Sequence, residues 1–298
     1  MKVRPKIGIV GVGMVGTPLQ KYFSEYKKNR RGVDLFLYDA NPAKKYNDDV
    51  SQADVIFISV PSPRFADGSC DISIVESAVK SIRGNKIIVI KSTVPPGTTE
   101  SLQKKYPKHK FLFNPEFLTE KNAWQDFIKP DRQIVGYATG NLKAAKIVLP
   151  LLPPASFSSP SKSIQITASE AELIKYGANV YLARKINFAN VLTNVSDVLG
   201  LKYKNVQAGL SADRRIGGSH LDVYHGGYRG FGGFCFPKDL DAFVARLDEL
   251  DLKDEANFLR KDKEFNKNLL AKQGLTLEDV SVHDHEWIKK KIKTKKQK

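Results

Sequence analysis

The 298-residue sequence has no apolar run of the roughly 18–20 residues that a membrane-spanning helix needs. It has only two cysteines, Cys70 and Cys235. Two thiols are too few for a disulfide framework, although a single bridge stays open, and they favour a reducing cytoplasm. Residues 1–5 lead directly into a strand-like segment, so no secretory signal is expected. The five histidines lack metal-ligand spacing, and no metal is expected.

Negative charge is scarce relative to positive charge, since the formal net charge is +16. Part of the excess lies in a lysine-rich C-terminal run at 289–298. Like charges repel one another, which favours a solvated, disordered tail; docking to nucleic acid or to an anionic surface is the alternative. No nucleic-acid fold motif accompanies the run, so nucleic acid is not the favoured partner. The remaining charge suits an enzyme with anionic ligands.

The first half of the chain alternates apolar strand-like runs with helical patterns. The expected strands lie at 6–11, 33–39, 55–60, 86–91 and 110–113. The expected helices between them lie at 14–28, 72–82 and 98–106. This alternation predicts an α/β fold with a doubly wound parallel sheet and right-handed crossovers.

The character of the sequence changes near residue 150. A proline- and serine-rich stretch at 149–163 reads as a linker or loop. Residues 169–199 then follow with helical spacing of apolar side chains and no proline. A helix of about 30 residues would be about 45 Å long, so we expect it to pack against a second copy in a homodimer. A further helical region is expected from Asp239 to Gly274, after a glycine-rich loop at 216–233.

A dinucleotide site is predicted where the first strand ends. Gly11, Gly13 and Gly16 form the pattern G-x-G-x-x-G, which closes an apolar strand and opens a helix. Such glycines allow a tight turn and a close approach of the backbone to a pyrophosphate. Asp39, at the end of the second strand, would accept hydrogen bonds from both ribose hydroxyls and repel a 2′-phosphate, so NAD is favoured over NADP. A turn without any ligand is the alternative reading.

The stretch 230–239 surrounds Cys235 with glycines and a proline, and Asp239 is placed to begin the next helix. A cysteine near a helix N-terminus and a lysine can become a nucleophile. A buried, inert cysteine is the common alternative. Lys175 and Asn179, four residues apart on the long helix, could share one oxygen atom of a ligand, or they could be an ordinary surface pair.

Two further segments follow strands. Glu116 and Glu120 could act on protons or hold sugar hydroxyls, although ordinary surface glutamates are the alternative. The segment 91–98 turns from a strand into a helix at the carboxyl edge of the sheet, where ligands bind in such folds.

These segments together resemble the UDP-glucose/GDP-mannose dehydrogenase family. The match covers most of the chain in family order: the glycine pattern at 11–16, then 92–97, 114–118, 130–136, 171–179, 215–217 and 230–239. The resemblance implies an N-terminal Rossmann domain at 1–160. It also implies a helical domain at 161–280, built on one long helix like the C-terminal domain of 6-phosphogluconate dehydrogenase, and a basic tail at 281–298.

The resemblance implies a four-electron oxidation of UDP-glucose to UDP-glucuronate, with two NAD⁺ used in succession. Cys235 would form a thiohemiacetal and then a thioester. The implied catalytic residues are Cys235, Lys175, Asn179, Glu120, Thr93 and Asp239. The implied NAD-binding residues are Gly11, Gly13, Met14, Val15, Gly16, Asp39, Ser62, Thr93, Glu120 and Lys238. The implied substrate-binding residues are Glu116, Phe117, Leu118, Glu120, Lys175, Asn179, Arg215, Tyr228, Phe231 and Gly232, with Arg215 reaching across a dimer interface.

One departure from the family pattern concerns the nucleotide part of the substrate. Family members carry a third domain for it, and this sequence contains no segment that matches one. The missing groups would then come from a separate chain, from the other subunit, or from nothing at all. Two alternatives follow: a two-electron hydroxyacid or 6-phosphogluconate dehydrogenase type of enzyme, and a non-catalytic chain descended from the family.

Overall fold

The computed structural model describes residues 4–119, 121–155, 163–224 and 226–281. The lysine-rich tail and residues 156–162 of the proline- and serine-rich stretch lie outside these residues. Within the described part of the chain, we find no helix with the length and apolar character needed to cross a membrane.

The chain forms two compact units. Unit 1 contains Met1–Pro63 and Cys70–Lys175, and unit 2 contains Tyr176–Lys298 together with the segment Arg64–Ser69. This short segment belongs to unit 2 because Arg64 forms an ion pair with Asp241, which also binds Lys263 at 2.7 Å. The boundary near Lys175 falls within one continuous helix.

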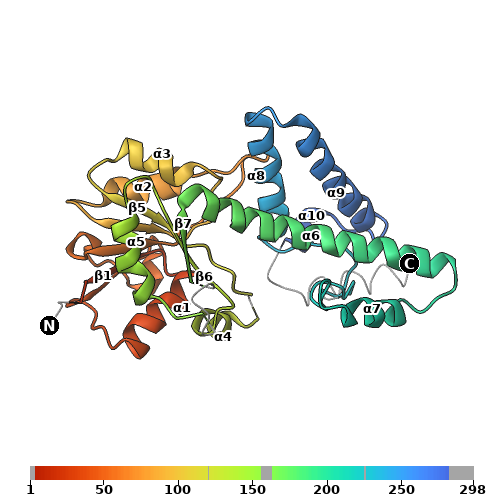
Figure 1. Ribbon diagram of the computed structural model, residues 1–298, viewed down its shortest axis with the longest axis horizontal. Coiled ribbons are helices and arrows are strands. Elements are labelled where there is room, and N and C mark those ends of the chain that lie inside the picture. Colours follow the sequence, from red (N-terminus) through yellow and green to blue (C-terminus); the bar gives the residue numbers. More distant parts are fainter. Residues whose placement is uncertain (1–3, 120, 156–162, 225, 282–298) are drawn as a thin grey trace. The chain divides into compact units, whose positions relative to one another are not determined.

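Unit 1 is built on a seven-stranded sheet with the order β2-β1-β3-β4-β5-β6-β7. Figure 1 labels its strands, which are β1 (Ile7–Val10), β2 (Leu35–Tyr38), β3 (Val55–Ile58), β4 (Ile87–Ile90), β5 (Lys110–Phe113), β6 (Gln133–Tyr137) and β7 (Ser163–Thr167). The first five are the five strands predicted from the sequence, and they pair in parallel. Strand β1 lies between β2 and β3, so the strand order reverses beside β1, where dinucleotides bind in folds of this kind.

The last two strands were not predicted. Strand β6 runs antiparallel to β5, and β7 runs parallel to β6. An antiparallel neighbour needs no long crossover, and only the six-residue helix α4 (Ala123–Ile128) lies between β5 and β6. The sheet is therefore parallel from β2 to β5 and mixed at its far edge.

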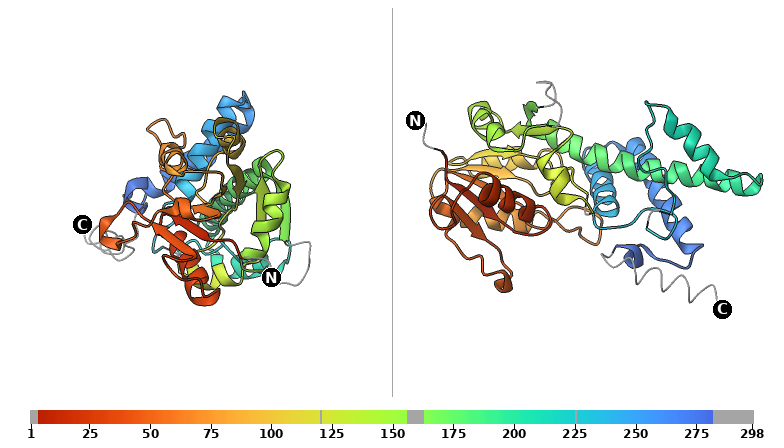
Figure 2. Two further views of the ribbon diagram at one scale, coloured as in Figure 1. Left: turned by 90° about the vertical axis from the view of Figure 1, so that its left-hand side faces the viewer. Right: turned by 90° about the horizontal axis from the view of Figure 1, so that it is seen from below.

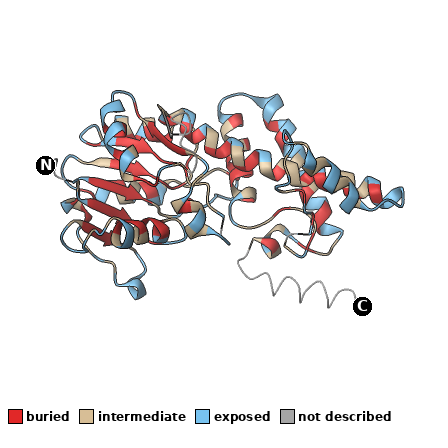
Figure 3. Cartoon of the chain, turned by 60° about the horizontal axis from the view of Figure 1, so that its bottom comes forward, coloured by how far each residue is buried: buried red, intermediate tan, exposed pale blue. Residues whose placement is uncertain are grey.

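Helices cover both faces of the sheet. One face packs against α1 (Gly16–Lys21), α4 and α5 (Leu142–Val148), with a buried cluster that includes Leu19, Phe127 and Val148. The other face packs against α2 (Ser73–Ser81), α3 (Thr98–Lys105) and the first turn of α6, through residues such as Val79, Leu102 and Ala171. The strands β1 to β5 between these layers are almost wholly buried (Figure 3). This burial explains why they read as continuous apolar runs in the sequence.

Unit 2 is helical, as the sequence predicted. Its helices are α6 (Ala168–Val198, shared with unit 1), α7 (Tyr203–Ala212), α8 (Phe236–Glu249), α9 (Lys253–Ala271) and α10 (Leu277–Val280). Helix α6 is continuous in every view (Figures 1 and 2). Helices α8 and α9 divide the region that the sequence indicated as helical from Asp239, and they are separated at Asp251, whose φ is 58°. Helix α8 begins at Phe236, three residues earlier than expected, because Pro237 fits the first turn of a helix.

One face of α6 is buried and polar, and another is exposed and apolar. The exposed apolar side chains recur with a spacing of three, four or seven residues: Tyr181, Phe188, Val191, Val195 and Val198. An apolar stripe with this spacing is typical of a helix that packs against another helix.

The N-terminal part of α6 is tied to α3 by a buried carboxylate. Glu172 accepts hydrogen bonds from the Gly97 N–H at 2.6 Å and the Thr99 N–H at 2.8 Å. Its third bond comes from the Thr99 hydroxyl at 2.5 Å. These amides are orphan donors at the start of α3, which Glu172 therefore caps from another element. Burial raises the pKa of Glu172 to about 7, although the hydrogen bonds from Thr99 and Gly97 act in the opposite direction.

Glu172→Gln should change the pH dependence of stability. Below pH 4.5 and above pH 7 Glu172 has the same protonation in the folded and unfolded states, but between these values the folded state retains a proton. Stability from this group is therefore lost as pH rises from 4.5 to 7, by about 3 kcal/mol, relative to a variant that cannot titrate. Urea unfolding of both proteins at several pH values measures the difference.

The matched control is Glu170→Gln on the same helix. Hydrogen bonds from Thr167 lower the pKa of this exposed carboxylate, so its contribution should change with pH in the opposite sense. A wild-type advantage over Glu172→Gln that grows with pH would show that hydrogen bonding outweighs burial at Glu172.

Candidate active site

The glycine pattern at the end of β1 forms a tight turn in which two glycines are required for packing. Gly11 has a φ of +87°, and a Cβ there would lie 2.7 Å from the Ser59 carbonyl oxygen. A Cβ on Gly16 would lie 1.9 Å from the carbonyl oxygen of Gly11. Gly13 differs, because a Cβ there would meet no atom within 4 Å. The turn thus has an open face at Gly13, and the close approach of a pyrophosphate fits this face.

Asp39 is fixed beside this turn. Its carboxylate accepts hydrogen bonds from the Val12 N–H at 2.7 Å and the Asn41 N–H at 2.9 Å, and Lys44 Nζ lies 2.9 Å away. Desolvation acts to raise the pKa of Asp39, but the bonds from Asn41, Lys44 and Val12 together hold it below its ordinary value. These contacts favour the ionised form of the Asp39 carboxyl. The contact between Lys44 and Asp39 was not predicted from the sequence. The only signal for it is that Lys44 follows Asp39 by five residues.

Two further predicted residues of the cofactor site, Ser62 and Thr93, follow neighbouring strands, whereas Lys238 lies in α8 of unit 2. The hydroxyl of Ser62, after β3, donates to the Thr93 carbonyl oxygen at 2.7 Å, after β4. Cys70 Sγ lies 3.9 Å from the same oxygen. The structure thus brings Ser62 and Thr93 together at the carboxyl edge of the sheet. Met14 is exposed and Val15 is half-buried in the glycine turn.

A second group of unit 1 side chains converges on Glu116. Buried Lys91 lies 3.1 Å from Glu116 Oε2 and donates to Asn114 Oδ1 at 2.7 Å. Lys175 donates to the backbone carbonyl oxygen of Glu116 at 2.5 Å. Glu116 and Lys175 come from separate predicted motifs, and the fold brings them into contact. Lys91 was not singled out, although a lysine that ends a buried strand is itself a signal.

Phe117 lies beside this group. The guanidinium of Arg132 stacks on the Phe117 ring at 3.8 Å, and desolvation lowers the pKa of Arg132. Lys91, Glu116, Phe117 and Arg132 contribute to the lining of a cavity of about 200 Å³ in unit 1. Leu118, the next residue after Phe117, is half-buried. Glu120 lies outside the described residues.

In unit 2 the predicted catalytic residues gather at the start of α8. Cys235 is the N-cap residue of this helix, and its side chain is exposed. Asp239 lies in the first turn and is 1% exposed. Its carboxylate accepts from Asn179 Nδ2 at 2.5 Å and lies 2.5 Å from Lys238 Nζ. Both cysteines belong to the described residues, and no disulfide joins them.

The predicted substrate residues of the glycine-rich loop are mostly buried. Tyr228 packs against Leu270 and Val280, and burial raises its pKa to about 12. Phe231 lies in the cluster of α8 and α9. A Cβ on Gly232 would lie 2.4 Å from the Tyr228 hydroxyl oxygen. Because the side chains of Tyr228 and Phe231 are buried, a ligand at these positions would meet the loop backbone. Arg215 is exposed and forms an ion pair with Asp213 at 2.6 Å.

The fold and the glycine turn define a two-unit dinucleotide-binding protein of the dehydrogenase type. Family models agree with this class. Residues 39–149 match the NAD binding domain of the UDP-glucose/GDP-mannose dehydrogenase family, and residues 169–268 match the central domain of that family. The chain belongs to the UDP-glucose/GDP-mannose dehydrogenase family, and its N-terminal unit is the NAD-binding domain.

Individual relatives agree with this assignment. The chain is 34% identical over 276 residues to the UDP-glucose 6-dehydrogenase of Rickettsia bellii, which covers 89% of this chain and 60% of that protein. The structure of a UDP-glucose dehydrogenase from Pyrobaculum islandicum aligns with a TM-score of 0.74 and 29% identity, over 89% of this chain and 68% of that one. The chain thus spans about 60% of the length of the curated relative.

A shorter enzyme shares the fold alone. The 3-hydroxyisobutyrate dehydrogenase of Mycobacterium tuberculosis aligns with a TM-score of 0.62 and 16% identity, over 90% of this chain and 96% of that one.

Alanine substitutions in the glycine turn should separate packing from cofactor binding. Gly16→Ala places a methyl group against backbone, so we expect a loss of about 3 kcal/mol or more in stability and a Tm lower by several degrees. Gly13→Ala meets open space and should leave the Tm unchanged while weakening NAD binding at least tenfold. Differential scanning calorimetry and titration calorimetry with NAD measure the two effects. Unchanged NAD affinity in Gly13→Ala would mean that the cofactor does not use this face.

Proposed function

We propose that the chain oxidises the C6 alcohol of a nucleotide sugar, UDP-glucose, to the carboxylate with two NAD⁺, and that Cys235 is the covalent nucleophile. The observation that carries the proposal is the start of α8. An exposed cysteine is the N-cap residue of this helix. Buried Asp239, in the first turn of α8, binds Asn179 of α6 and Lys238 of α8. A thiol at a helix N-terminus beside a lysine is suited to nucleophilic chemistry.

NAD⁺, when bound at the glycine turn, accepts a hydride from the C6 carbon in each of two oxidation steps. The first oxidation converts the alcohol to an aldehyde, and the hydroxyl proton passes to a base or to water. The Cys235 thiolate then adds to the aldehyde carbon, and the oxygen takes up a proton as the thiohemiacetal forms. The second oxidation leaves a thioester. Water attacks its carbonyl carbon, the C–S bond breaks, and the acid departs with Cys235 restored as a thiolate.

The reaction requires groups that stabilise the alkoxide, position the water and hold the cofactor. Lys175 and Asn179 lie one turn apart on α6, and both are buried amide or ammonium donors that can stabilise a developing alkoxide. We assign the positioning of water to Thr93, Asp239 and Glu120, the last of which lies outside the described residues. Ser62 and Lys238 complete the cofactor contacts in this proposal.

For the sugar, we propose contacts from the segment 116–118 and from the backbone of the loop that contains Tyr228, Phe231 and Gly232. The interior position of both aromatic side chains favours backbone rather than side-chain contacts from this loop. Exposed Arg215 would bind substrate of the partner subunit. The nucleotide part of the substrate would be held by a separate chain or by the other subunit.

A two-electron hydroxyacid dehydrogenase is the second candidate. The fold shared with an enzyme of that type, over almost its whole length, favours it. Such an enzyme needs no cysteine thioester and would form one NADH per substrate. A non-catalytic chain of the same family would bind NAD without turnover.

The thiol chemistry requires a reduced cysteine, which is consistent with a cytoplasmic location.

Turnover with UDP-glucose distinguishes these candidates. We expect two NADH per UDP-glucose consumed, measured at 340 nm with the purified chain, and no net acid formation by Cys235→Ser. Cys70→Ser is the matched control and should retain net acid formation. One NADH per substrate, unaffected by Cys235→Ser, would favour the two-electron enzyme. NAD binding without any turnover would reject activity of this chain alone on UDP-glucose.

We also propose that the exposed apolar stripe of α6 forms a homodimer. Phe188→Gln with Val195→Gln should convert the dimer to a monomer in sedimentation velocity, because both side chains lie on the stripe. The matched control is Phe258→Gln with Leu250→Gln. Phe188 and Phe258 are both 57% exposed, but Phe258 lies on α9 and Leu250 lies in the α8–α9 turn. A monomeric wild type, or equal effects of the two pairs, would refute the role of α6.

A further inference from the structure

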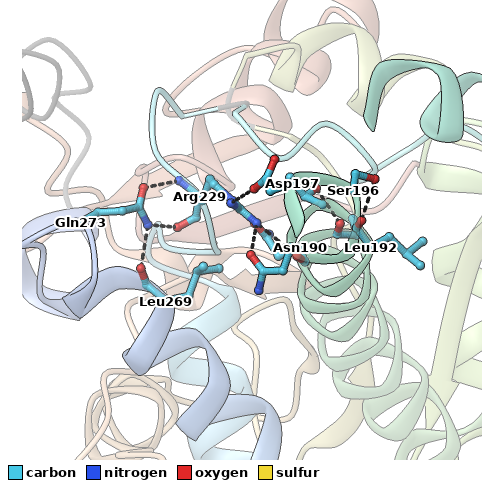
Figure 4. A network of polar contacts seen from close by, with 10 residues as sticks. Asn190, Leu192, Ser196, Asp197, Arg229, Leu269 and Gln273 are labelled. Atoms are coloured by element: carbon cyan, nitrogen blue, oxygen red, sulfur yellow. Dashed lines mark hydrogen bonds and ion pairs between the residues drawn. The ribbon is translucent and has the colours of Figure 1, made fainter. Parts of the chain in front are cut away.

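The loop that precedes Cys235 is fixed to α6 by one arginine side chain. Arg229 Nε donates to Asn190 Oδ1 at 2.9 Å, and Nη2 donates to the Asn190 carbonyl oxygen at 3.1 Å and to Asn194 Oδ1 at 2.7 Å. Its Nη1 lies 3.2 Å from Asp197 Oδ2. The guanidinium side chain is 14% exposed. Figure 4 shows it beside Asn190 and Asp197 of α6. Asn194 lies four residues after Asn190 in the same helix.

The backbone of the same loop is fixed to the α9–α10 region. Gln273 accepts from the Arg229 N–H at 2.8 Å and donates to the Arg229 carbonyl oxygen at 2.8 Å (Figure 4). Asn266 makes the same paired contact with Phe231, at 2.8 and 2.9 Å. The Gly233 N–H donates to the Val280 carbonyl oxygen at 2.8 Å. These hydrogen bonds fix the loop backbone to the α9–α10 region. The Arg229 side chain then connects the loop to α6.

Cys235 lies between two such attachments to α6. Arg229 is six residues before it, and Asp239, which binds Asn179 of α6, is four residues after it. Only Phe234 separates the bonded amide of Gly233 from Cys235, whose carbonyl oxygen accepts the helical bond from the Asp239 N–H at 2.8 Å. The position of the thiol relative to α6 therefore depends on both attachments.

From these contacts we propose that Arg229 is a positioning residue, which sets the place of the Cys235 thiol relative to α6 and so controls its attack on the aldehyde. This proposal rests on the proposed function of Cys235. An arginine suits the task because its planar guanidinium carries N–H groups on three nitrogens in a fixed geometry, whereas a lysine carries all its donors on one compact ammonium nitrogen. A displacement of about 1 Å can slow a reaction that depends on orientation by about a hundredfold.

The test compares two reactions of the same aldehyde, a UDP-sugar oxidised to the aldehyde at C6. Oxidation of the aldehyde by NAD⁺ to the acid requires attack by Cys235, whereas its reduction by NADH to the alcohol does not. Arg229→Gln should slow the oxidation at least tenfold and leave the reduction within twofold of the wild type. A general structural defect would slow both reactions alike, and that outcome, like equal rates in variant and wild type, would overturn the proposal.

Two further variants complete the design. Arg246→Gln removes the ion pair between half-buried Arg246 and exposed Glu249 on α8 and should leave both reactions unchanged. If Arg229→Gln does not fold, as judged by its Tm, Arg229→Lys decides. The lysine keeps the charge but only part of the contacts, so it should slow the oxidation selectively, by at least threefold. Wild-type rates in this variant would overturn the proposal.

The proposed function can fail independently. If the wild-type chain catalyses neither reaction, thiol position is read from alkylation of Cys235 by iodoacetamide in a Cys70→Ser background. A rate changed at least threefold by Arg229→Gln, with Arg246→Gln unchanged, would support the positioning role although the dehydrogenase activity had failed. Equal alkylation rates in Arg229→Gln and its parent would overturn it.

Discussion

The rest of the structure depends on the polar contacts that one face of α6 makes. Glu172 caps α3, Lys175 holds the backbone of Glu116, and Asn179 binds the carboxylate of Asp239. These residues are spaced by three and four, so they lie on the same face of the helix. Glu172 and Lys175 thus hold the segments that follow β4 and β5 within unit 1, and Asn179 holds the start of α8 within unit 2.

Such a face is costly to build, since each of its groups is buried and polar. An unmade hydrogen bond at a buried polar group costs about 1–3 kcal/mol, more when the group is charged. The fold meets this cost by giving every such carboxylate several donors: Glu172 has three, and Asp239 has both an amide and an ammonium. The raised pKa of Glu172 shows that burial still opposes its charge. Preorganised donors of this kind are also what a developing oxyanion requires.

The sequence predicted the first five strands and most helices because their signals are local. Buried parallel strands are continuous apolar runs, and α6 has an uninterrupted helical period over 31 residues. It did not predict β6 and β7, which form the mixed end of the sheet with less apolar sequences, β7 being the edge strand. The break between α8 and α9 was also missed, since it depends on the left-handed backbone of Asp251, a residue type that tolerates this conformation without being a glycine.

The candidate site was predicted to a different extent in its two kinds of residue. The residues to which we propose a chemical role lie in short sequence motifs. Two pairs of them are in contact in the structure, Ser62 with Thr93 and Asn179 with Asp239. The residues that hold them were not assigned a role from the sequence: Lys44, Lys91, Asn266 and Gln273. The role of a single lysine or amide depends on which atoms it meets after folding. Tertiary structure alone supplies that information.

The glycine-rich loop before Cys235 illustrates how these two kinds of residue depend on each other. Two of its glycines, Gly230 and Gly232, are required by the packing of the loop itself, because a Cβ would lie 2.6 Å from Asn266 Oδ1 and 2.4 Å from the Tyr228 hydroxyl oxygen, respectively. Small residues here let amide side chains reach the backbone. A loop without regular structure gains a fixed backbone when side chains from rigid helices satisfy its amides and carbonyls. Loop and helices together therefore give a flexible sequence the fixed geometry that a nucleophilic thiol needs.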